Sequence, residues 1–502
     1  MHGRSCDVKQ GDLSGKGLVF IAPCVGTKSQ PGRSQSTRSS REAGQCPWSE
    51  GVQEGGCARI ELNERQPVRV SEKAKQTGKA RPQEWDWVEH SVWTERMLEA
   101  LEKGVKGDVW FSLIDKVYRP TTLYAGWLAV KANKGSAGSD RQSIKDFERN
   151  LEDNLGRLHR ELENGSYRPR PIRRVYIDKP GSKEKRPLGI PCVRDRVVQA
   201  ALRVVIEPIF ENEFSTQSYG FRPGLGCKDA LREVDRLLKD GYVHVVDADL
   251  KGYFDSIPHD RLMGEVRKHL ADGRLLGLLE SFLKQEIMED LAVWSPEQGT
   301  PQGAVISPLL ANLYLHSVDV AMRHAGFHMV RYADDFVILC RSPQEAETAL
   351  RLAQELTVAK GLTLHPEKTR LVDARVRGMG FDFLGYHFER GTRWPRKKSL
   401  KKLKDTIRGK TRRCNGKSLS AIIADVNVTL RGWFGYFKHS NQRTFPGLDG
   451  WVRRRLRSIL RTQSKRKGIS RGYDNIRWPK RFFRDHGFFS LEEAHRALLQ
   501  SS

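Results

Sequence analysis

The stretch Tyr332-Ala-Asp-Asp-Phe-Val-Ile-Leu339 places two adjacent aspartates, Asp334 and Asp335, before an apolar run. Neighbouring side chains of a straight strand face opposite sides, so two acids that act together fit a tight hairpin turn better. We therefore predict an interrupted strand pair over residues 329–339. Taken alone, an Asp-Asp pair is also typical of an ordinary solvated hairpin.

A second apolar run, Tyr242-Val-His-Val-Val246, is predicted to be a strand that leads into Asp249. A sheet that sets the two strands side by side brings three carboxylates to one place. Such like charges are costly unless cations neutralise them, and hard oxygen ligands favour Mg²⁺. The expected chemistry is phosphoryl transfer with two Mg²⁺ ions, one activating a hydroxyl and one holding a triphosphate.

The 502-residue chain is long enough for two or three domains, and its mixed helix and strand periods predict an α+β fold. Residues 1–84 lack periodicity and are predicted to be a disordered basic extension. Helix-like spacing follows to about residue 165. Val175 to Ile177 and the run after Arg186 predict a basic hairpin, and residues 260–270 predict a helix.

The formal charge of +26 indicates a polyanionic partner, and nucleic acid is favoured over a membrane surface. Residues 391–502 contain 29 Lys and Arg against 7 Asp and Glu, a net charge of +22. This concentration predicts a separate basic helical domain. Within it, Arg453, Arg454, Arg455, Arg457 and Arg461 are predicted to form the basic face of an amphipathic helix.

Other partners and compartments are disfavoured by the same sequence. The apolar stretch from Gly17 to Val25 contains Pro23 and is too short to span a bilayer. The eight cysteines include no Cys-x-x-Cys pair, so neither a zinc site nor a disulfide framework is expected. A reducing cytoplasmic compartment, with the protein at the bacterial nucleoid, is the expected location.

Six motifs follow one another along the chain, and motifs in this order are highly specific. They are Asn133-Lys-Gly-Ser-Ala-Gly138, Arg186-Pro-Leu-Gly-Ile-Pro191, Gln217-Ser-Tyr-Gly-Phe-Arg-Pro-Gly224, Thr300-Pro-Gln-Gly-Ala-Val-Ile-Ser-Pro-Leu-Leu-Ala-Asn-Leu-Tyr314, Tyr332-Ala-Asp-Asp335 and Phe383-Leu-Gly385. In these residues the sequence resembles the group II intron reverse transcriptases, also called maturases, from about Trp85 to the C-terminus.

The resemblance implies that Asp249, Asp334 and Asp335 are catalytic and hold two Mg²⁺ ions, with Asp249 and Asp334 as the principal ligands. It implies that Phe254 lies under the incoming sugar and excludes a 2′-hydroxyl, although the neighbouring Tyr253 is an alternative. Asp247 and Asp255 are expected to be structural.

The resemblance also implies contacts to the other substrates. Lys179 and Arg186 are expected to grip the triphosphate, with Lys183 or Lys185 as alternatives to Lys179. Gln302 is expected beside the incoming nucleotide. Arg222 is expected to touch the template strand, or else to stabilise its turn.

Beyond the polymerase segment, Leu430-Arg-Gly-Trp-Phe-Gly-Tyr-Phe437 resembles the thumb, or maturase, motif. Most of its aromatic residues are assigned to packing and the basic surface to RNA. Residues 465–502 resemble the small DNA-binding region of the family. Because no cysteine follows Cys414, no His-Asn-His endonuclease is expected.

The resemblance therefore implies a right-hand polymerase with domains at 85–240 (N-terminal extension and fingers), 241–390 (palm), 391–464 (thumb or maturase) and 465–502 (DNA-binding). The implied function is RNA-directed DNA synthesis from dNTPs on an RNA template, with a DNA primer or target, and binding of the parent group II intron RNA to assist splicing and retrohoming. Alternatives are a splicing factor with a vestigial polymerase, an RNA-dependent RNA polymerase, and a reverse transcriptase recruited to defence or repair.

Overall fold

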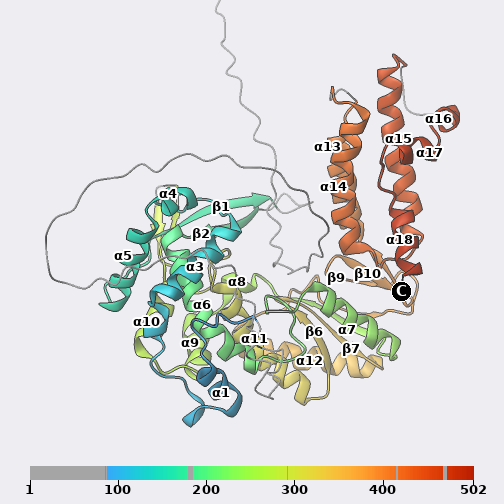
Figure 1. Cartoon of the computed structure of the whole chain (residues 1–502). Coiled ribbons are helices and arrows are strands. Elements are labelled where there is room, and N and C mark those ends of the chain that lie inside the picture. The colour runs from blue at the N-terminus through green and yellow to red at the C-terminus, as the bar shows by residue number, and fades with distance from the viewer. Residues whose placement is uncertain are drawn as a thin grey trace, which may run out of the picture. The chain divides into compact units, whose positions relative to one another are not determined.

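The computed structural model describes residues 85, 87–178, 185–290, 292–413, 416–466 and 472–501 (Figure 1). The predicted extension 1–84 and the residues Lys179 and Lys183 lie outside the described residues. Everything that follows concerns Trp87–Ser502, which cluster as one unit. The α+β class predicted from the sequence is confirmed, because helices enclose small sheets that are largely antiparallel.

Helices occupy the N-terminal part of this unit, as the spacing predicted. They are α1 (Glu95–Lys103), the 3-10 turn η3 (Lys106–Asp108), α2 (Ile114–Val117), α3 (Pro120–Asn133), α4 (Ile144–Arg149) and α5 (Leu151–Glu163). Trp127 of α3 is buried and stacks on Phe147 of α4, with ring centroids 5.2 Å apart. The helices thus share an aromatic core.

The predicted basic hairpin is confirmed and forms half of a four-stranded sheet. Strand β1 (Ile172–Asp178) pairs antiparallel with β2 (Lys185–Ile190), and the sheet order is β2-β1-β4-β5. Strands β4 (Ile287–Glu289) and β5 (Ala292–Trp294) come from far along the chain, within the stretch expected to be palm. The sequence did not predict this pairing, because a three-residue strand has too short a pattern to detect.

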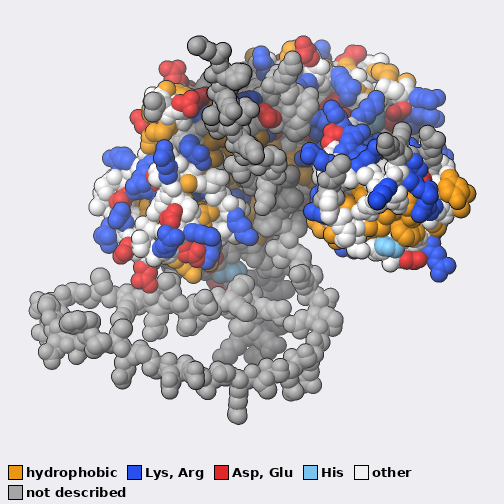
Figure 2. Space-filling model, turned by 90° about the horizontal axis from the view of Figure 1, so that it is seen from above, with side chains coloured by type: hydrophobic (Ala, Val, Ile, Leu, Met, Phe, Trp, Pro, Cys, Tyr) orange, Lys and Arg blue, Asp and Glu red, His pale blue; other side chains and the backbone are white. Residues whose placement is uncertain are grey.

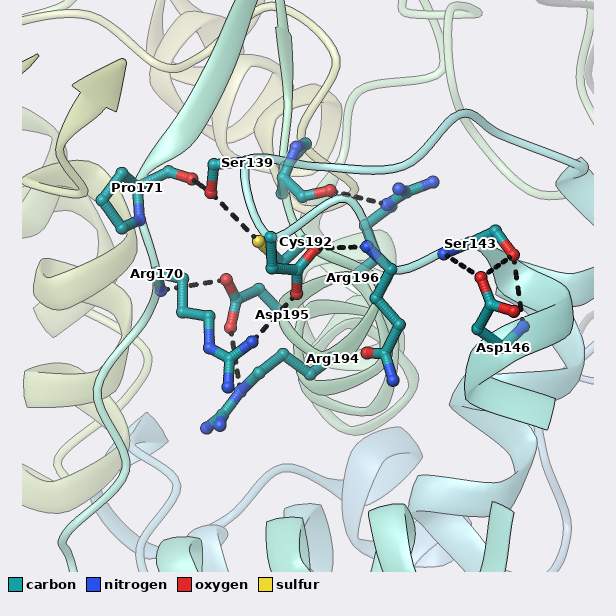
Figure 3. A network of polar contacts seen from close by, with 12 residues as sticks. Ser139, Ser143, Asp146, Arg170, Pro171, Cys192, Arg194, Asp195 and Arg196 are labelled. Carbon is teal, nitrogen blue, oxygen red and sulfur yellow. Dashed lines mark hydrogen bonds and ion pairs between the residues drawn. The ribbon is translucent and has the colours of Figure 1, made fainter. Parts of the chain in front are cut away.

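A buried polar network joins this sheet to α6 (Val193–Glu213) (Figure 3). Asp195 of α6 is fully buried and accepts hydrogen bonds from the Tyr167 hydroxyl (2.6 Å) and the Arg170 backbone N–H (3.0 Å). Burial raises the pKa of the Asp195 carboxyl to about 6, although these donors and Arg194 lower it. The network fixes the start of α6 against the strand that follows Arg170.

The central sheet has the order β6-β7-β3-β8, and all its pairs are antiparallel. Its strands are β3 (His244–Asp249), β6 (His328–Tyr332), β7 (Asp335–Cys340) and β8 (Arg370–Asp373). The interrupted strand pair predicted at 329–339 is confirmed as β6 and β7. The strand predicted at 242–246 begins later, at His244, because the Tyr242 N–H bonds to the Leu237 carbonyl in the turn after a helix.

Helices cover both faces of this sheet. Buried side chains of α7 (Cys227–Lys239) pack with Val245, Val337 and Leu339 on one face. Side chains alternate along a strand, so Val246 and Ile338 face the other side, where α12 (Pro343–Ala359) packs on β3 and β7. A small sheet of β9 (Phe381–Phe383), β10 (Tyr386–Glu389) and β11 (Thr392–Pro395) extends the α7 side of the core.

The remaining helices of this region are α8 (Tyr253–Ser256), α9 (His259–Arg267), α10 (Gly273–Leu283) and α11 (Ser307–His324). The helix predicted at 260–270 is α9, which ends three residues earlier than expected. It ends there because Leu270 forms a β-bridge with Trp110, whose N–H bonds to the His269 carbonyl (2.8 Å). A tertiary contact therefore overrides the helical pattern.

The C-terminal region is helical, as predicted. Its helices are α13 (Lys397–Lys410), α14 (Leu419–Phe437), α15 (Thr444–Gln463), α16 (Gly472–Arg477), α17 (Lys480–Asp485) and α18 (Leu491–Gln500). Trp433 stacks on Phe437 with centroids 4.8 Å apart, and Phe434 meets Phe445 edge-on. The assignment of these aromatic residues to packing is confirmed. Trp433 contacts both the core of the central sheet and the core of the C-terminal helices.

The predicted basic face of α15 is wrong. Arg453 and Arg457 are only 7% and 6% exposed, and the Arg457 Nε donates to the Trp478 carbonyl (2.9 Å). Arg461 forms an ion pair with the buried Asp474. These arginines are spaced four residues apart, so they share the helix face on which α16–α18 pack. The helices α16 to α18 therefore belong to the same helical core.

Candidate active site

The central sheet brings the three predicted aspartates to one end of neighbouring strands. Asp249 is the last residue of β3, Asp335 is the first residue of β7, and the two are directly opposite each other in the antiparallel register. Asp334 lies in the two-residue turn between β6 and β7. The hairpin predicted from Tyr332-Ala-Asp-Asp335 is thus present, and it places Asp334 next to the Asp249–Asp335 pair.

The turn that carries Asp334 is conformationally unusual. Ala333 has a φ of +60°, in the left-handed region that non-glycine residues seldom adopt. Its carbonyl accepts a hydrogen bond from Arg331 Nη1 (3.0 Å). Gly220 packs so closely that a Cβ there would lie 2.4 Å from the Ala333 nitrogen. The surroundings therefore hold the turn, and only glycine fits at position 220.

A buried ion pair supports this turn from below. Arg331 and Asp319 have side chains that are 2% and 1% exposed, and both carboxylate oxygens accept from the guanidinium. The same arginine donates to Asn312 Oδ1, and the Asn312 amide donates to the Gly220 carbonyl (2.6 Å). This network links α11, β6 and the Gln217–Gly224 motif to the position of Asp334. No pattern in the sequence predicts this network.

The electrostatics of the cluster are those of crowded acids. Burial and, to a smaller extent, the charges of Asp247, Asp334 and Asp249 together raise the pKa of Asp335 to about 7. Burial and the Asp249 charge also raise the pKa of Asp334, while Arg186 and Lys368 lower it. Like charges in a half-buried place are mutually destabilising. The cluster therefore attracts cations.

Two protein cations already lie beside these acids. The Lys368 Nζ forms an ion pair with Asp249 Oδ2, and the Arg370 guanidinium forms one with Asp247 (3.0 Å). The latter contact fits the expectation that Asp247 is structural. Lys368 is a functional candidate that sequence reasoning missed, because a lysine in a loop carries no signal until the Leu250–Leu364 bridge places it beside β3.

The donor set suits a hard divalent ion. Carboxylate oxygens are the ligands that Mg²⁺ prefers, and Mg²⁺ usually keeps waters and substrate phosphates as its other ligands. Within the described ranges, no three acidic, His or Cys side chains converge closely enough to form a metal site unaided. Asp249, Asp334 and Asp335 supply oxygen donors of this kind.

Phe254 and its alternative Tyr253 have distinct environments. Tyr253 is 2% exposed, and its hydroxyl donates to the Ala311 carbonyl (2.5 Å), so it belongs to the core. Phe254 is half-buried, and its backbone carbonyl accepts from the Thr300 N–H (2.6 Å). Of the two rings, Phe254 is the one available to a substrate.

The loop that carries Gln302 contacts both the β1–β2 hairpin and the short helix α8, which carries Phe254. The Gln302 carbonyl accepts from the Gly189 N–H (2.7 Å), and its side-chain amide donates to Asp255 (3.1 Å). A Cβ at Gly303 would lie 2.4 Å from the Gly189 carbonyl oxygen. The glycines of two motifs therefore allow the loop to abut the β1–β2 hairpin.

The remaining residues predicted to contact substrates lie on β2 and in the Gln217–Gly224 motif. Arg186 is exposed on β2, and its charge acts on Asp334. Lys185, the alternative to Lys179, is also exposed there. Arg222 has a side chain only 9% exposed, which binds Glu211 and donates to the Ser215 and Ser218 carbonyls (2.6 and 2.7 Å). These contacts favour the turn-stabilising role for Arg222.

Comparisons with known proteins match two segments of the chain. Residues 177–388 match the reverse transcriptase (RNA-dependent DNA polymerase) family, and residues 400–478 match the group II intron, maturase-specific domain. The first segment contains the acidic cluster and the second contains most of the C-terminal helices. The two matches follow in the order that the motifs predicted.

Individual relatives agree with these matches. The group II intron-encoded protein LtrA of Lactococcus lactis is 36% identical over 45% of this chain, which spans 38% of LtrA. The protein YkfC of Escherichia coli is 34% identical over 53% of this chain and 80% of its own length. A solved partial Cas6-RT-Cas1–Cas2 complex aligns with 49% of this chain and 42% of its own, at 25% identity and a TM-score of 0.33. The two family matches and the two sequence relatives show that the chain belongs to the reverse transcriptases of the group II intron-encoded family, with a maturase-specific segment after the polymerase segment.

Proposed function

We propose that the protein is an RNA-directed DNA polymerase that binds group II intron RNA, assists its splicing and copies it into DNA during retrohoming. The observation that carries the proposal is the pairing of Asp249 with Asp335 across β3 and β7, with Asp334 in the adjoining turn. Family membership supports it. Because the chain spans only 38% of LtrA, activity, substrates and partners are proposed for this chain on its own residues.

In this proposal Asp249, Asp334 and Asp335 hold two Mg²⁺ ions. The bound ions would supply a more acidic primer 3′-hydroxyl and charge stabilisation for the leaving pyrophosphate. The chain's own part is to fix three carboxylates at one end of a sheet, through the Arg331–Asp319 pair beneath the turn. Lys368 lies at Asp249 as a neighbouring positive charge.

Substrate selection is assigned to the residues around this cluster. Phe254 would lie against the sugar of the incoming dNTP, where a ring excludes a 2′-hydroxyl. Arg186, together with Lys179, would bind the triphosphate, since a guanidinium fork and an ammonium both suit phosphate oxygens. Gln302 would contact the nucleotide from its glycine-rich loop. A template contact by Arg222 would require it to leave its present partners.

Intron RNA binding is assigned to the basic C-terminal helices and DNA-target binding to residues 465–502. We propose that the protein acts in the bacterial cytoplasm at the nucleoid, where its DNA target would lie. Among the helices that the structure describes, none is both long and apolar enough to cross a membrane.

The decisive experiment is primer extension on an RNA template with dNTPs and Mg²⁺, comparing the purified chain with Asp334→Ala. Synthesis by the parent that is lost in the variant supports the polymerase and its metal site together. If neither protein extends a primer but both bind RNA tightly and salt-sensitively, the polymerase proposal is wrong and a splicing factor is favoured. Supplying ribonucleotides in a parallel reaction tests the RNA polymerase alternative.

A further inference from the structure

A polar cavity lies among the N-terminal helices and shares no residue with the acidic cluster. Its volume is about 270 Å³. The loop before α4, helix α5, the segment that leads into β1 and the start of α6 all contribute to its walls. The polar side chains of the lining are Asp140, Gln142, Asn154, Arg157, Arg170 and Arg194.

The cavity is positively charged, although the helices around it are not. Its lining contains three arginines and one acid, Asp140. Residues 144–163, which form α4 and α5, contain four Lys and Arg against six Asp and Glu, a net charge of −2. Figure 2 shows both signs of charge mixed over the N-terminal helices, whereas Lys and Arg gather over the C-terminal helices. A long polyanion would meet these acids, so the balance favours a small anion.

Two of the arginines are held in place by a buried acid (Figure 3). One oxygen of Asp195 accepts from the Arg170 backbone N–H (3.0 Å), and the other lies 3.6 Å from Arg194 Nε. Arg194 also forms an ion pair with Glu161 and lies over the Tyr167 ring, and its side chain is only 12% exposed. Guanidinium groups fixed in this way lose little freedom on binding and suit phosphate oxygens.

The third arginine supplies charge that the fold does not use. Arg157 is exposed on α5 and, among the residues that the structure describes, has no acidic partner. In contrast, Arg170 Nη1 is paired with Asp140 Oδ2 (3.0 Å), whose other oxygen accepts from the Gln142 N–H (3.1 Å). Asp140 therefore orients Arg170 at the cavity, and Arg157 adds the charge that an anion would neutralise.

The rest of the lining suits a nucleobase. Gln142 and Asn154 carry amides, the groups that match the N6 and N7 edge of adenine. The Asn154 amide is held by donation to the Phe147 carbonyl (3.0 Å). Phe147 and Leu158, both buried, give the cavity a small apolar part. Sites for small molecules usually measure roughly 300–1,000 Å³, so this cavity limits the ligand to about one nucleotide.

We propose that this cavity binds a single nucleotide, with its phosphate at Arg157 and Arg170 and its base at Gln142 and Asn154. Two sources offer this chemistry, a free nucleoside 5′-phosphate and the 5′-phosphorylated end of a strand, and the test distinguishes them. The inference goes beyond the proposed function, because it uses none of the residues assigned to polymerisation.

The test is equilibrium dialysis of the full chain against labelled AMP in the presence of EDTA, which removes the divalent ions proposed for the acidic cluster. Arg157→Gln should weaken AMP binding by about tenfold or more, because a charge-assisted hydrogen bond to the phosphate is lost. Adenosine, which lacks the phosphate, should bind the parent at least about tenfold more weakly than AMP. It should bind the parent and Arg157→Gln equally.

The matched control is Arg160→Gln, which removes the same charge from the same helix. Arg160 is exposed and does not line the cavity. Its loss should change AMP affinity by less than about twofold, since salt screens exposed charges. Saturating AMP should raise the thermal unfolding midpoint of the parent and of Arg160→Gln, and should raise that of Arg157→Gln less. Without AMP the three midpoints should be equal.

Competition with short RNA strands separates the two sources. Displacement of AMP by a 5′-phosphorylated strand, but not by the same strand with a 5′-hydroxyl, assigns the site to a strand end. Displacement by neither strand assigns it to a free nucleotide. Displacement by both would show that the strand backbone covers the cavity, and would overturn the nucleotide site.

Two further results would overturn the proposal. One is an AMP affinity that is the same in Arg157→Gln as in the parent, or that falls equally in Arg160→Gln. The other is AMP binding no tighter than adenosine. Primer extension by the parent is measured separately and needs Mg²⁺, so failure of the nucleotide site and failure of the polymerase proposal are distinguishable.

Discussion

Two groups of like charges in this molecule, of opposite sign, are built in opposite ways. The acidic group, Asp249, Asp334 and Asp335, lies half-buried at the ends of paired strands and is held by a buried ion pair. The basic group on α13, which includes Lys397, Lys401 and Arg408, lies in solvent on flexible side chains. Buried charges need close cations at fixed positions, whereas exposed ones attract a polyanion over a distance limited by salt. The first arrangement suits chemistry and the second suits binding.

The largest expected effect is loss of synthesis when the acidic group is broken. Asp334→Ala should reduce the rate of primer extension on the order of 10⁴-fold, the size of effect seen when a group at a reacting centre is removed. RNA affinity should stay within about twofold of the parent, because the exposed basic residues of α13 are untouched. Parallel extension and RNA-binding titrations check this. A variant that keeps a tenth or more of the activity would show that Asp334 is not a metal ligand.

The rigid support of the acidic group should be essential to stability. Arg331→Met leaves the Asp319 carboxylate buried without its partner, so the free energy of unfolding should fall by about 3–5 kcal/mol. Urea unfolding followed by tryptophan fluorescence measures the change. The matched control is Arg375→Met, which breaks an exposed pair with Asp373 and should cost less than about 1 kcal/mol. Equal effects would contradict the structural role of the buried pair.

Sugar selection should depend on one ring beside the acidic group. Phe254→Ala should raise the use of ribonucleotides relative to deoxynucleotides by about 10- to 100-fold, since an open space no longer excludes the 2′-hydroxyl. Single-nucleotide incorporation with each substrate gives the ratio. Tyr253→Phe, which removes only the hydroxyl donated to Ala311, should leave the ratio unchanged. If only Tyr253→Phe changes the ratio, Tyr253 selects the sugar and Phe254 does not.

The buried Asp195 accepts hydrogen bonds from neighbouring donors, whereas Asp249, Asp334 and Asp335 lie beside one another. The pKa of Asp195 is raised from 3.8 to about 6, so the folded protein binds a proton more tightly than the unfolded chain. Its contribution to stability is therefore present below about pH 4 and is lost as the pH rises to about 6, by no more than about 3 kcal/mol. Asp195→Asn should flatten this dependence. The midpoints of urea unfolding, measured for both proteins between about pH 4 and pH 6, test this prediction. If the stability of Asp195→Asn changes with pH in parallel with that of the parent, the assignment is contradicted.

Much of the fold and the candidate site could be predicted from short stretches of the sequence. The interrupted strand pair, the hairpin at Asp334, the basic β1–β2 hairpin and the helical C-terminal region all follow from short-range patterns, and the structure confirms them. Such patterns depend on the side-chain period of each element. The motif order additionally predicted the family.

What the sequence by itself determined is the set of chemical groups: clustered acids, a basic C-terminal region and an aromatic helix. Only the tertiary structure decided which groups meet, because strand pairing and helix packing join residues far apart in the chain. It placed Lys368 at Asp249, enclosed Arg222 among carbonyl oxygens, and turned Arg453 and Arg457 of α15 inward. A charged residue has the same sequence signature in solvent and in a satisfied interior, so only its packed partners reveal which role it has.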